Sequence, residues 1–181
     1  MDEERYRSLL DAHGLLRGGA LEPPSRAEAY TVFAQREDAR IDLAAWQRHA
    51  SRFFETDLGL SVQKRYEQEA PEVDVAHLIV APQDGQGGAR FCYARPVLHE
   101  DKAAAQTADL RAGYTGLATL AQRCTYVWLV VLEKDDDPVA LRIAAILASV
   151  VLGPILAPAG DELFGVRTAR LKLERRGAPY R

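Results

Sequence analysis

The clearest hydrophobic pattern in the chain is the run Tyr126-Val-Trp-Leu-Val-Val-Leu132, in which no polar residue alternates with the apolar ones. Such a run of β-branched and aromatic residues is typical of a strand buried on both faces. An acidic turn follows at Asp135-Asp136-Asp137, and a long apolar segment then extends from Val139 to Ala157. Strands of this kind lie in sheets that helices cover, so the pattern predicts an α/β fold with this strand in the centre of the sheet.

Upstream of residue 71 the pattern is mainly helical. Ser25-Arg-Ala-Glu28 has the spacing of a capping box, in which the first and fourth side chains bond each other's backbone amides. It opens a stretch without Gly or Pro that extends to Thr56, although Tyr30 to Phe33 could instead form a strand. A shorter helix is predicted from Val62 to Glu69, because Pro71 disfavours its continuation.

Beyond residue 71 strand patterns alternate with helical ones. Val73 to Pro82 and Arg90 to Leu98 are predicted strands, and the short glycine-rich loop between them predicts an antiparallel hairpin. Asp101 to Gln122 is a predicted helix, and alternation from Val166 to Leu173 predicts a last strand. Right-handed crossovers would leave the second, third and fourth strands parallel. The predicted fold is therefore a mixed, mainly parallel four-stranded sheet (ββαβαβ) with helices packed on it, preceded by an α-helical N-terminal region.

Length and charge limit the classes of protein. The 181 residues are enough for one compact unit, with an α-helical region at 1–70 and an α/β core at 71–181. The formal net charge of −3 makes nucleic acid an unfavoured partner. The first residues lack the pattern of a signal peptide, which predicts a cytoplasmic location. Arginine outnumbers lysine 19 to 4, a codon bias that indicates a GC-rich, bacterial source.

One candidate site follows from the predicted topology. The carboxyl ends of parallel strands meet at one edge of a sheet, where ligands usually bind. That edge would bring together Asp74, His99, Glu100 and Asp136, whose oxygen and nitrogen atoms suit a hard cation such as Mg²⁺ or Mn²⁺. With such an ion, Asp74, Glu100 and Lys102 are the candidate catalytic residues of a hydrolase, the lysine orienting or activating water.

Two observations weigh against that metal site. The order Asp74…Glu100-x-Lys102 is similar to the D…ExK layout of metal-dependent nucleases, but the acids here follow the strand, so the family is not assigned. Asp101 and Asp137 stand at predicted helix starts, where carboxylates stabilise a helix without any ligand. Capping is therefore favoured over metal binding, and the absence of a cofactor over Mg²⁺ or Mn²⁺.

The two cysteines offer little catalytic chemistry. Cys92 and Cys124 lie in or beside apolar strand patterns, which predicts reduced, buried thiols. Cys92 could act as a nucleophile with His77 on the neighbouring strand. A position in the middle of a strand and the lack of a third, orienting group disfavour this pairing.

The apolar segment from Val139 to Ala157 has about the length of a short transmembrane helix, but Arg142 and Pro154 interrupt it, so no membrane span is predicted. A helix that is apolar on all sides must be covered on all sides. The cover could come from the N-terminal helices, from a second copy of the chain or from a different partner.

The function favoured by these patterns is a non-enzymatic cytoplasmic accessory or protein-interaction subunit, an oligomer or the partner of another protein. The alternative is a metal-dependent hydrolase or nuclease that uses the acidic sheet edge. A further alternative is a small-ligand sensor at the same edge.

Overall fold

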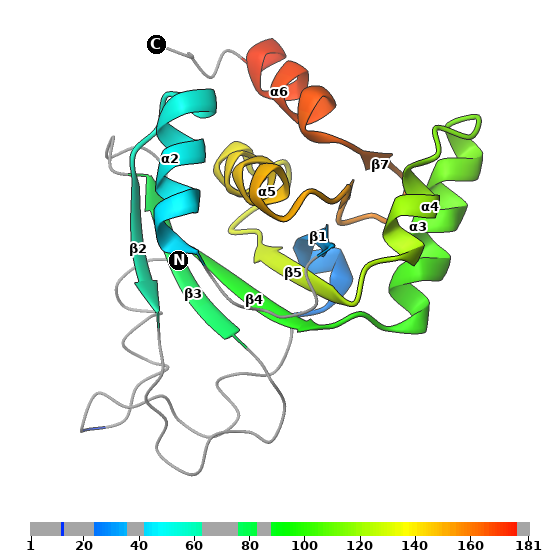
Figure 1. Ribbon diagram of the computed structural model, residues 1–181, viewed down its shortest axis with the longest axis horizontal. Coiled ribbons are helices and arrows are strands. Elements are labelled where there is room, and N and C mark those ends of the chain that lie inside the picture. Colours follow the sequence, from blue (N-terminus) through cyan, green and yellow to red (C-terminus); the bar gives the residue numbers. More distant parts are fainter. Residues whose placement is uncertain (1–11, 13–23, 36–41, 63–75, 83–87, 177–181) are drawn as a thin grey trace.

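The computed structural model describes residues 12, 24–35, 42–62, 76–82 and 88–176, and within them one antiparallel sheet (Figure 1). Its strand order is β2-β3-β4-β5-β1-β6-β7, and every pairing is antiparallel. Five strands of five to seven residues form its main part, and two strands of two residues extend it at one side. The strands are β1 (Ala29–Ala34), β2 (Leu58–Val62), β3 (Ala76–Pro82), β4 (Arg90–Pro96), β5 (Tyr126–Val131), β6 (Ile155–Leu156) and β7 (Leu163–Phe164).

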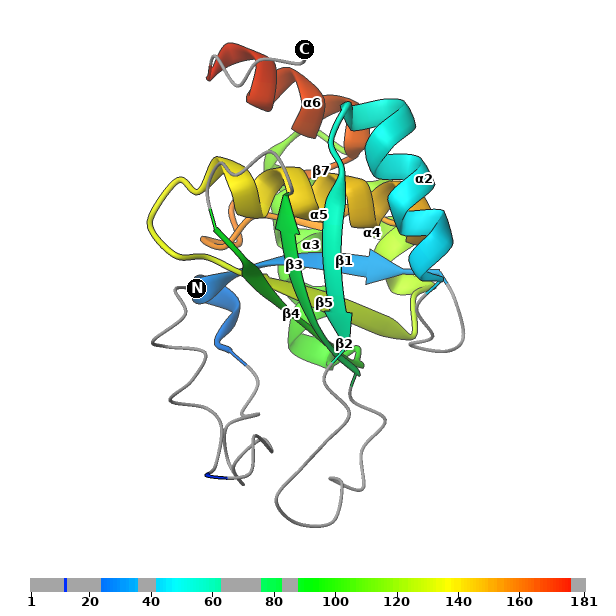
Figure 2. The ribbon, with the colours of Figure 1, turned by 90° about the vertical axis from the view of Figure 1, so that its left-hand side faces the viewer.

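The helices form two groups, one on each face of the sheet. Figure 1 and Figure 2 show α2 and α5 against one face with α6 packed on α5, while α3 and α4 lie together away from them. The helical elements are η1 (Arg26–Glu28), α2 (Leu43–Phe54), α3 (His99–Arg111), α4 (Leu117–Gln122), α5 (Pro138–Val151) and α6 (Val166–Arg175). The larger core lies beneath α2, α5 and α6.

The prediction of a central, buried strand is confirmed in β5. This strand lies between β4 and β1, and its residues 127–130 are at most 2 % exposed. Trp128 faces the larger core, where its ring lies edge-on to Trp46 of α2 at 5.9 Å. Val127 faces the smaller core beneath α3 and α4. A strand covered on both faces can be apolar at every position, which is the pattern seen in the sequence.

The predicted parallel topology is wrong, because the connection from β4 to β5 folds back on itself. A single helix was expected from Asp101 to Gln122, but the chain turns between α3 and α4, where Gly113, Tyr114 and Gly116 have φ of 82°, 67° and 85°. The two helices pack on each other and return the chain to the end of the sheet from which it left. β5 therefore starts beside the end of β4 and runs antiparallel to it. The rule of right-handed crossovers governs only parallel strands.

The N-terminal region is not wholly helical, contrary to the predicted fold class. The capping-box contact exists, since the carboxylate of Glu28 accepts a hydrogen bond from the Ser25 amide at 3.0 Å, but it begins only the short η1. The strand alternative for Tyr30 to Phe33 is confirmed, because β1 is inserted in the middle of the sheet. Val62, the expected start of a helix, ends β2, and the rest of that predicted helix lies outside the described residues.

The predicted last strand is also wrong, because residues 166–175 form α6. Ala169 and Leu173 are fully buried one helical turn apart, whereas Leu171 between them is 45 % exposed. The segment Thr168-Ala-Arg-Leu-Lys-Leu173 fits a two-residue period and a four-residue spacing equally well. Packing on α5 favours the helix, since it buries both apolar positions on one side.

The apolar segment after β5 forms α5, and its cover comes from the chain itself. Leu141, Ile143, Ile146 and Leu147 are fully buried by the sheet, by α2 and by α6. The helix ends where Gly153 passes the backbone of β1, because a Cβ atom there would lie 1.7 Å from the Phe33 carbonyl oxygen. Among the described residues, none of the helices has both the length and the apolar character that a membrane crossing requires.

Candidate functional site

The residues of the predicted metal site fall in different parts of the fold. His99, Glu100 and Lys102 form the first turn of α3, Asp136 lies in the turn between β5 and α5, and Asp74 is outside the described residues. Their convergence required β4 and β5 to end at the same edge of the sheet, but the two strands are antiparallel.

The described part of the chain contains no group of three or more His, Cys, Asp or Glu side chains that could hold a metal ion. Lys102 donates to the Gln122 carbonyl at 2.8 Å and thereby ties α3 to α4. The Glu100 carbonyl accepts a hydrogen bond from Arg26 at 3.2 Å. The complete set with Asp74 stays a prediction.

The capping role expected of Asp137 is confirmed. Its carboxylate accepts hydrogen bonds from the amides of Val139 and Ala140, at 3.0 and 3.1 Å, in the first turn of α5. It also accepts two from Arg90, from Nε at 2.6 Å and from Nη2 at 3.0 Å. Burial alone would raise the pKa of Asp137, but the bonds from Arg90 and from the amides of Glu133 and Ala140 outweigh it and hold this pKa below its ordinary value. This carboxylate is fully engaged in structure.

Asp101 has a comparable role at the start of α3. Its carboxylate accepts a hydrogen bond from the Leu98 amide at 2.8 Å, the bond a capping acid makes in the first turn. It also pairs with both terminal nitrogens of Arg95, at 2.6 and 2.9 Å. Neither Asp101 nor Asp137 is free to bind a ligand.

Neither thiol has the environment of a nucleophile. Cys92 is fully buried, and this burial raises its pKa far above the neutral range. It lies opposite Leu78 in the ladder, whereas His77 lies opposite Tyr93, so the considered Cys–His pair is out of register. Burial raises the pKa of Cys124 to about 11, partly offset by the charge of Lys102. Near neutral pH both thiols stay protonated.

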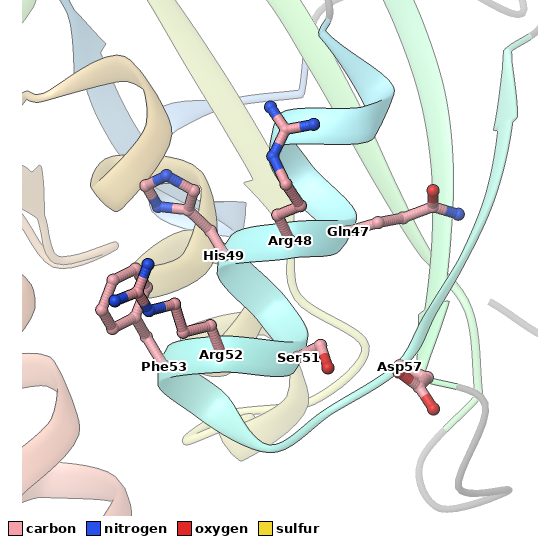
Figure 3. Close-up of a pocket in the computed structure, with 7 residues that line it drawn as sticks. All are labelled: Gln47, Arg48, His49, Ser51, Arg52, Phe53 and Asp57. Atoms are coloured by element: carbon pink, nitrogen blue, oxygen red, sulfur yellow. The ribbon is translucent and has the colours of Figure 1, made fainter.

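A hollow with a volume of about 600 Å³ follows the outer side of α2. Figure 3 shows His49, Arg52 and Phe53 extending from one side of this helix, and Gln47 and Ser51 from the other. The hollow is lined by Gln47, Arg48, His49, Ser51, Arg52, Phe53 and Asp57. It is thus a polar and basic surface with one large apolar side chain.

Two arginines and the carboxylate of Asp57 set the charge of the α2 hollow, which is therefore positive overall. Arg48 and Arg52 are exposed one helical turn apart, and neither makes an ion pair with a described residue. Like charges at this spacing destabilise a helix by about 0.2–0.5 kcal/mol. The Arg52 guanidinium lies 5.4 Å from the ring centre of Phe53, which is 42 % exposed. Binding an anionic group here would relieve the repulsion.

His49, which lines this hollow, has a structural contact with α5. Ser149 of α5 donates its hydroxyl proton to the Ile146 carbonyl at 2.6 Å. Its oxygen is therefore an acceptor for the Nδ1–H of His49, 2.9 Å away. The imidazole does not withdraw the serine proton in this arrangement, as a nucleophile and general base would require. The contact holds α2 against α5.

A second hollow, of about 360 Å³, contains Asp136. Arg176 forms an ion pair with Asp136, and Lys172 lies 2.6 Å from Glu162. Tyr30 of β1 lines the same hollow, and burial raises its pKa, opposed by the charge and hydrogen bond of Arg176. Both cations are therefore neutralised within the hollow itself.

A third hollow, of about 260 Å³, lies between α3 and α4 and includes His99 and Lys102. At its rim Tyr114 is 73 % exposed. Asp109 fixes this turn by accepting hydrogen bonds from the Thr115 hydroxyl, the Thr115 amide and the Gly116 amide. Chiefly the Thr115 hydroxyl bond holds the pKa of Asp109 below its ordinary value. Asp136 thus lines the second hollow, whereas His99 and Lys102 line the third, which is a separate surface.

The fold and the α2 hollow define an antiparallel α/β protein with a basic, partly aromatic helix surface. Comparisons of the chain with protein-family models, curated proteins and solved structures found no match. Arg48 and Arg52 were not among the predicted site residues, although their four-residue spacing within a predicted helix was a usable signal. Their exposure and lack of an acidic partner depend on how α2 packs.

Proposed function

We propose that this protein is a non-enzymatic interaction subunit that binds another protein through the outer side of α2. The observation that supports this function is the pair Arg48 and Arg52, which is exposed and unpaired among the described residues beside the exposed ring of Phe53. Arginine and aromatic side chains are enriched in protein interfaces. A bacterial, cytoplasmic accessory role belongs to the same proposal.

The surface used for association differs from the apolar helix that the sequence pointed to. α5 is covered within the chain, so its apolar side chains do not support association. The outer side of α2 is open to solvent. A second copy of the chain remains one possible partner for it.

An interaction role fits the chemistry of the described residues better than hydrolysis does. Asp101 and Asp137 are engaged in caps and ion pairs, both thiols are protonated, and the Ser149 proton bonds a backbone carbonyl. Arg48 and Arg52 of the α2 hollow make no ion pair with a described residue, and a guanidinium is suited to binding an anionic group.

Affinity capture with charge-reversal variants tests this role. The double variant Arg48→Glu/Arg52→Glu should lose a captured partner that the wild type retains, and mass spectrometry identifies that partner. The matched control is Arg111→Glu/Arg123→Glu, which makes the same change of charge at exposed positions of α3 and at the end of α4. Light scattering across a concentration series detects a second copy as the partner. Equal capture by all three proteins would exclude the α2 surface.

A further inference from the structure

Basic residues are concentrated in three helices of this protein. Helices α2, α5 and α6 contain seven basic residues and a single acid, a net charge of +6. The whole chain has a net charge of −3, so the rest of it carries −9. These three helices lie on the same side of the sheet (Figure 2). The residues are Arg48, Arg52, Arg142, Arg167, Arg170, Lys172 and Arg175, with Glu174 as the acid; together the three helices are called the basic helix layer.

The basic helix layer is continuous from α2 to α6. The Arg170 guanidinium of α6 lies 5.9 Å from the ring centre of Phe54 in α2, so a side chain bridges the two helices, both of which pack on α5. On α6, Arg167, Leu171 and Arg175 recur every four residues and are all exposed, with Leu171 at 45 %. α2 and α6 therefore each present a stripe of arginines with an exposed apolar side chain beside it.

The cations of this layer suit carboxylates. Six of the seven are arginines, and a planar guanidinium can donate two parallel hydrogen bonds to one carboxylate. Arg48, Arg52, Arg167 and Arg175 make no ion pair with any described residue. Their charge is thus available to a partner, whereas Lys172 is already paired with Glu162.

A protein segment fits this layer better than a nucleic acid does. Phe53 is the one large aromatic side chain exposed on these helices, whereas sequence-tolerant binding of a nucleic acid strand uses several aromatic platforms in succession. Charges are screened beyond about 8 Å at physiological ionic strength. A short acidic segment on these helices is therefore attracted mainly by the arginines that it contacts.

We propose that the basic helix layer binds an acidic segment of a partner protein that bears apolar side chains between its carboxylates. This inference rests on the proposed function and adds the chemistry of the partner. The carboxylates pair with the arginine stripes of α2 and α6. The apolar side chains of the segment pack on Phe53 and Leu171, which excludes water from the neighbouring ion pairs.

The test uses the full-length protein and fluorescence anisotropy with three labelled probes. The first is a peptide of Asp and Glu with Leu or Phe at every fourth position. The second has serine in place of its apolar residues, and the third is single-stranded oligothymidine. The first peptide should bind tightest, and its affinity should fall as salt is raised. Arg48→Glu/Arg52→Glu and Arg167→Glu/Arg175→Glu should each weaken it about tenfold or more, because each replaces attraction by repulsion.

Three outcomes would overturn the inference. Equal weakening by the control Arg111→Glu/Arg123→Glu would show a response to net charge alone. Oligothymidine binding as tightly as the first peptide would identify a nucleic acid surface. No binding of that peptide would exclude an acidic segment; if Arg48→Glu/Arg52→Glu still abolished affinity capture, the interaction role would stand with a partner of other chemistry. If the first peptide does not bind and Arg48→Glu/Arg52→Glu retains the captured partner, both proposals are rejected.

Discussion

Arg90 at the start of β4 and Asp137 before α5 form a buried ion pair across 47 positions of the sequence, with 3 % and 0 % of their side chains exposed. The pair fastens the central sheet to the helix that forms the middle of the larger core. Glu133 adds an ion pair to the same guanidinium at 2.8 Å. The cap that the sequence predicts at Asp137 is thus also a tertiary contact.

Replacing Arg90 by methionine should lower the free energy of unfolding by about 3–5 kcal/mol, because the buried carboxylate of Asp137 loses its counter-charge. The comparison is Lys172→Met, which opens the partly exposed Lys172–Glu162 pair and should cost less than about 1 kcal/mol. Urea denaturation measures both. The double variant Arg90→Met/Asp137→Asn should recover part of the loss, since it leaves no buried charge unpaired. Equal costs for Arg90→Met and Lys172→Met would contradict the assigned role.

Acid should destabilise the protein through Asp109 and Asp137. The pKa of each carboxyl is lower in the folded chain than in the unfolded chain, so in the interval between the two values the unfolded state binds more protons. The stability they contribute is therefore present above the unfolded value of about 4 and is lost as the pH falls through the folded value. Asp109→Asn should be less stable than the wild type at neutral pH and depend less on pH below about 4. Parallel pH profiles of the two proteins in urea titrations would refute this.

Thr31→Val should stabilise the fold by about 1 kcal/mol, because a buried hydroxyl without a partner has lost its hydration and gained no hydrogen bond. Thr31 is 0 % exposed, and its Oγ1 has no partner among the described residues. Valine keeps the β-branched shape that suits β1. Thr31→Ser is the control: it retains the hydroxyl, loses the methyl group and should be destabilised. A lower melting temperature for Thr31→Val would indicate that the hydroxyl has a partner.

Local patterns in the sequence were sufficient for the burial of β5 and for the start of α5. The apolar run at Tyr126–Leu132 identified the central strand because complete burial leaves no polar position in a strand. Asp137-Pro138 identified the start of α5, because an acidic cap followed by proline suits the first turn of a helix. Both features depend on neighbours within a few residues.

The direction of β5 and the position of the candidate site depended on contacts between distant segments. The turn at Gly113–Gly116 reverses the chain only because α3 and α4 pack on each other, which makes β5 antiparallel to β4. Asp136 consequently pairs with Arg176, the residue after the last helix, rather than lying with Glu100.

Neighbouring elements also decide the structure of segments whose local pattern fits both a strand and a helix. Tyr30 to Phe33 and Val166 to Leu173 suit a strand or a helix, and the neighbouring elements select between them. β1 takes its place between β5 and β6, where backbone hydrogen bonds on both sides favour a strand. Residues 166–175 instead bury Ala169 and Leu173 on α5, which favours a helix. The hydrophobic pattern of the sequence indicates which segments are buried. The direction of a strand and the pairing of distant charged side chains follow from the packing of the whole chain.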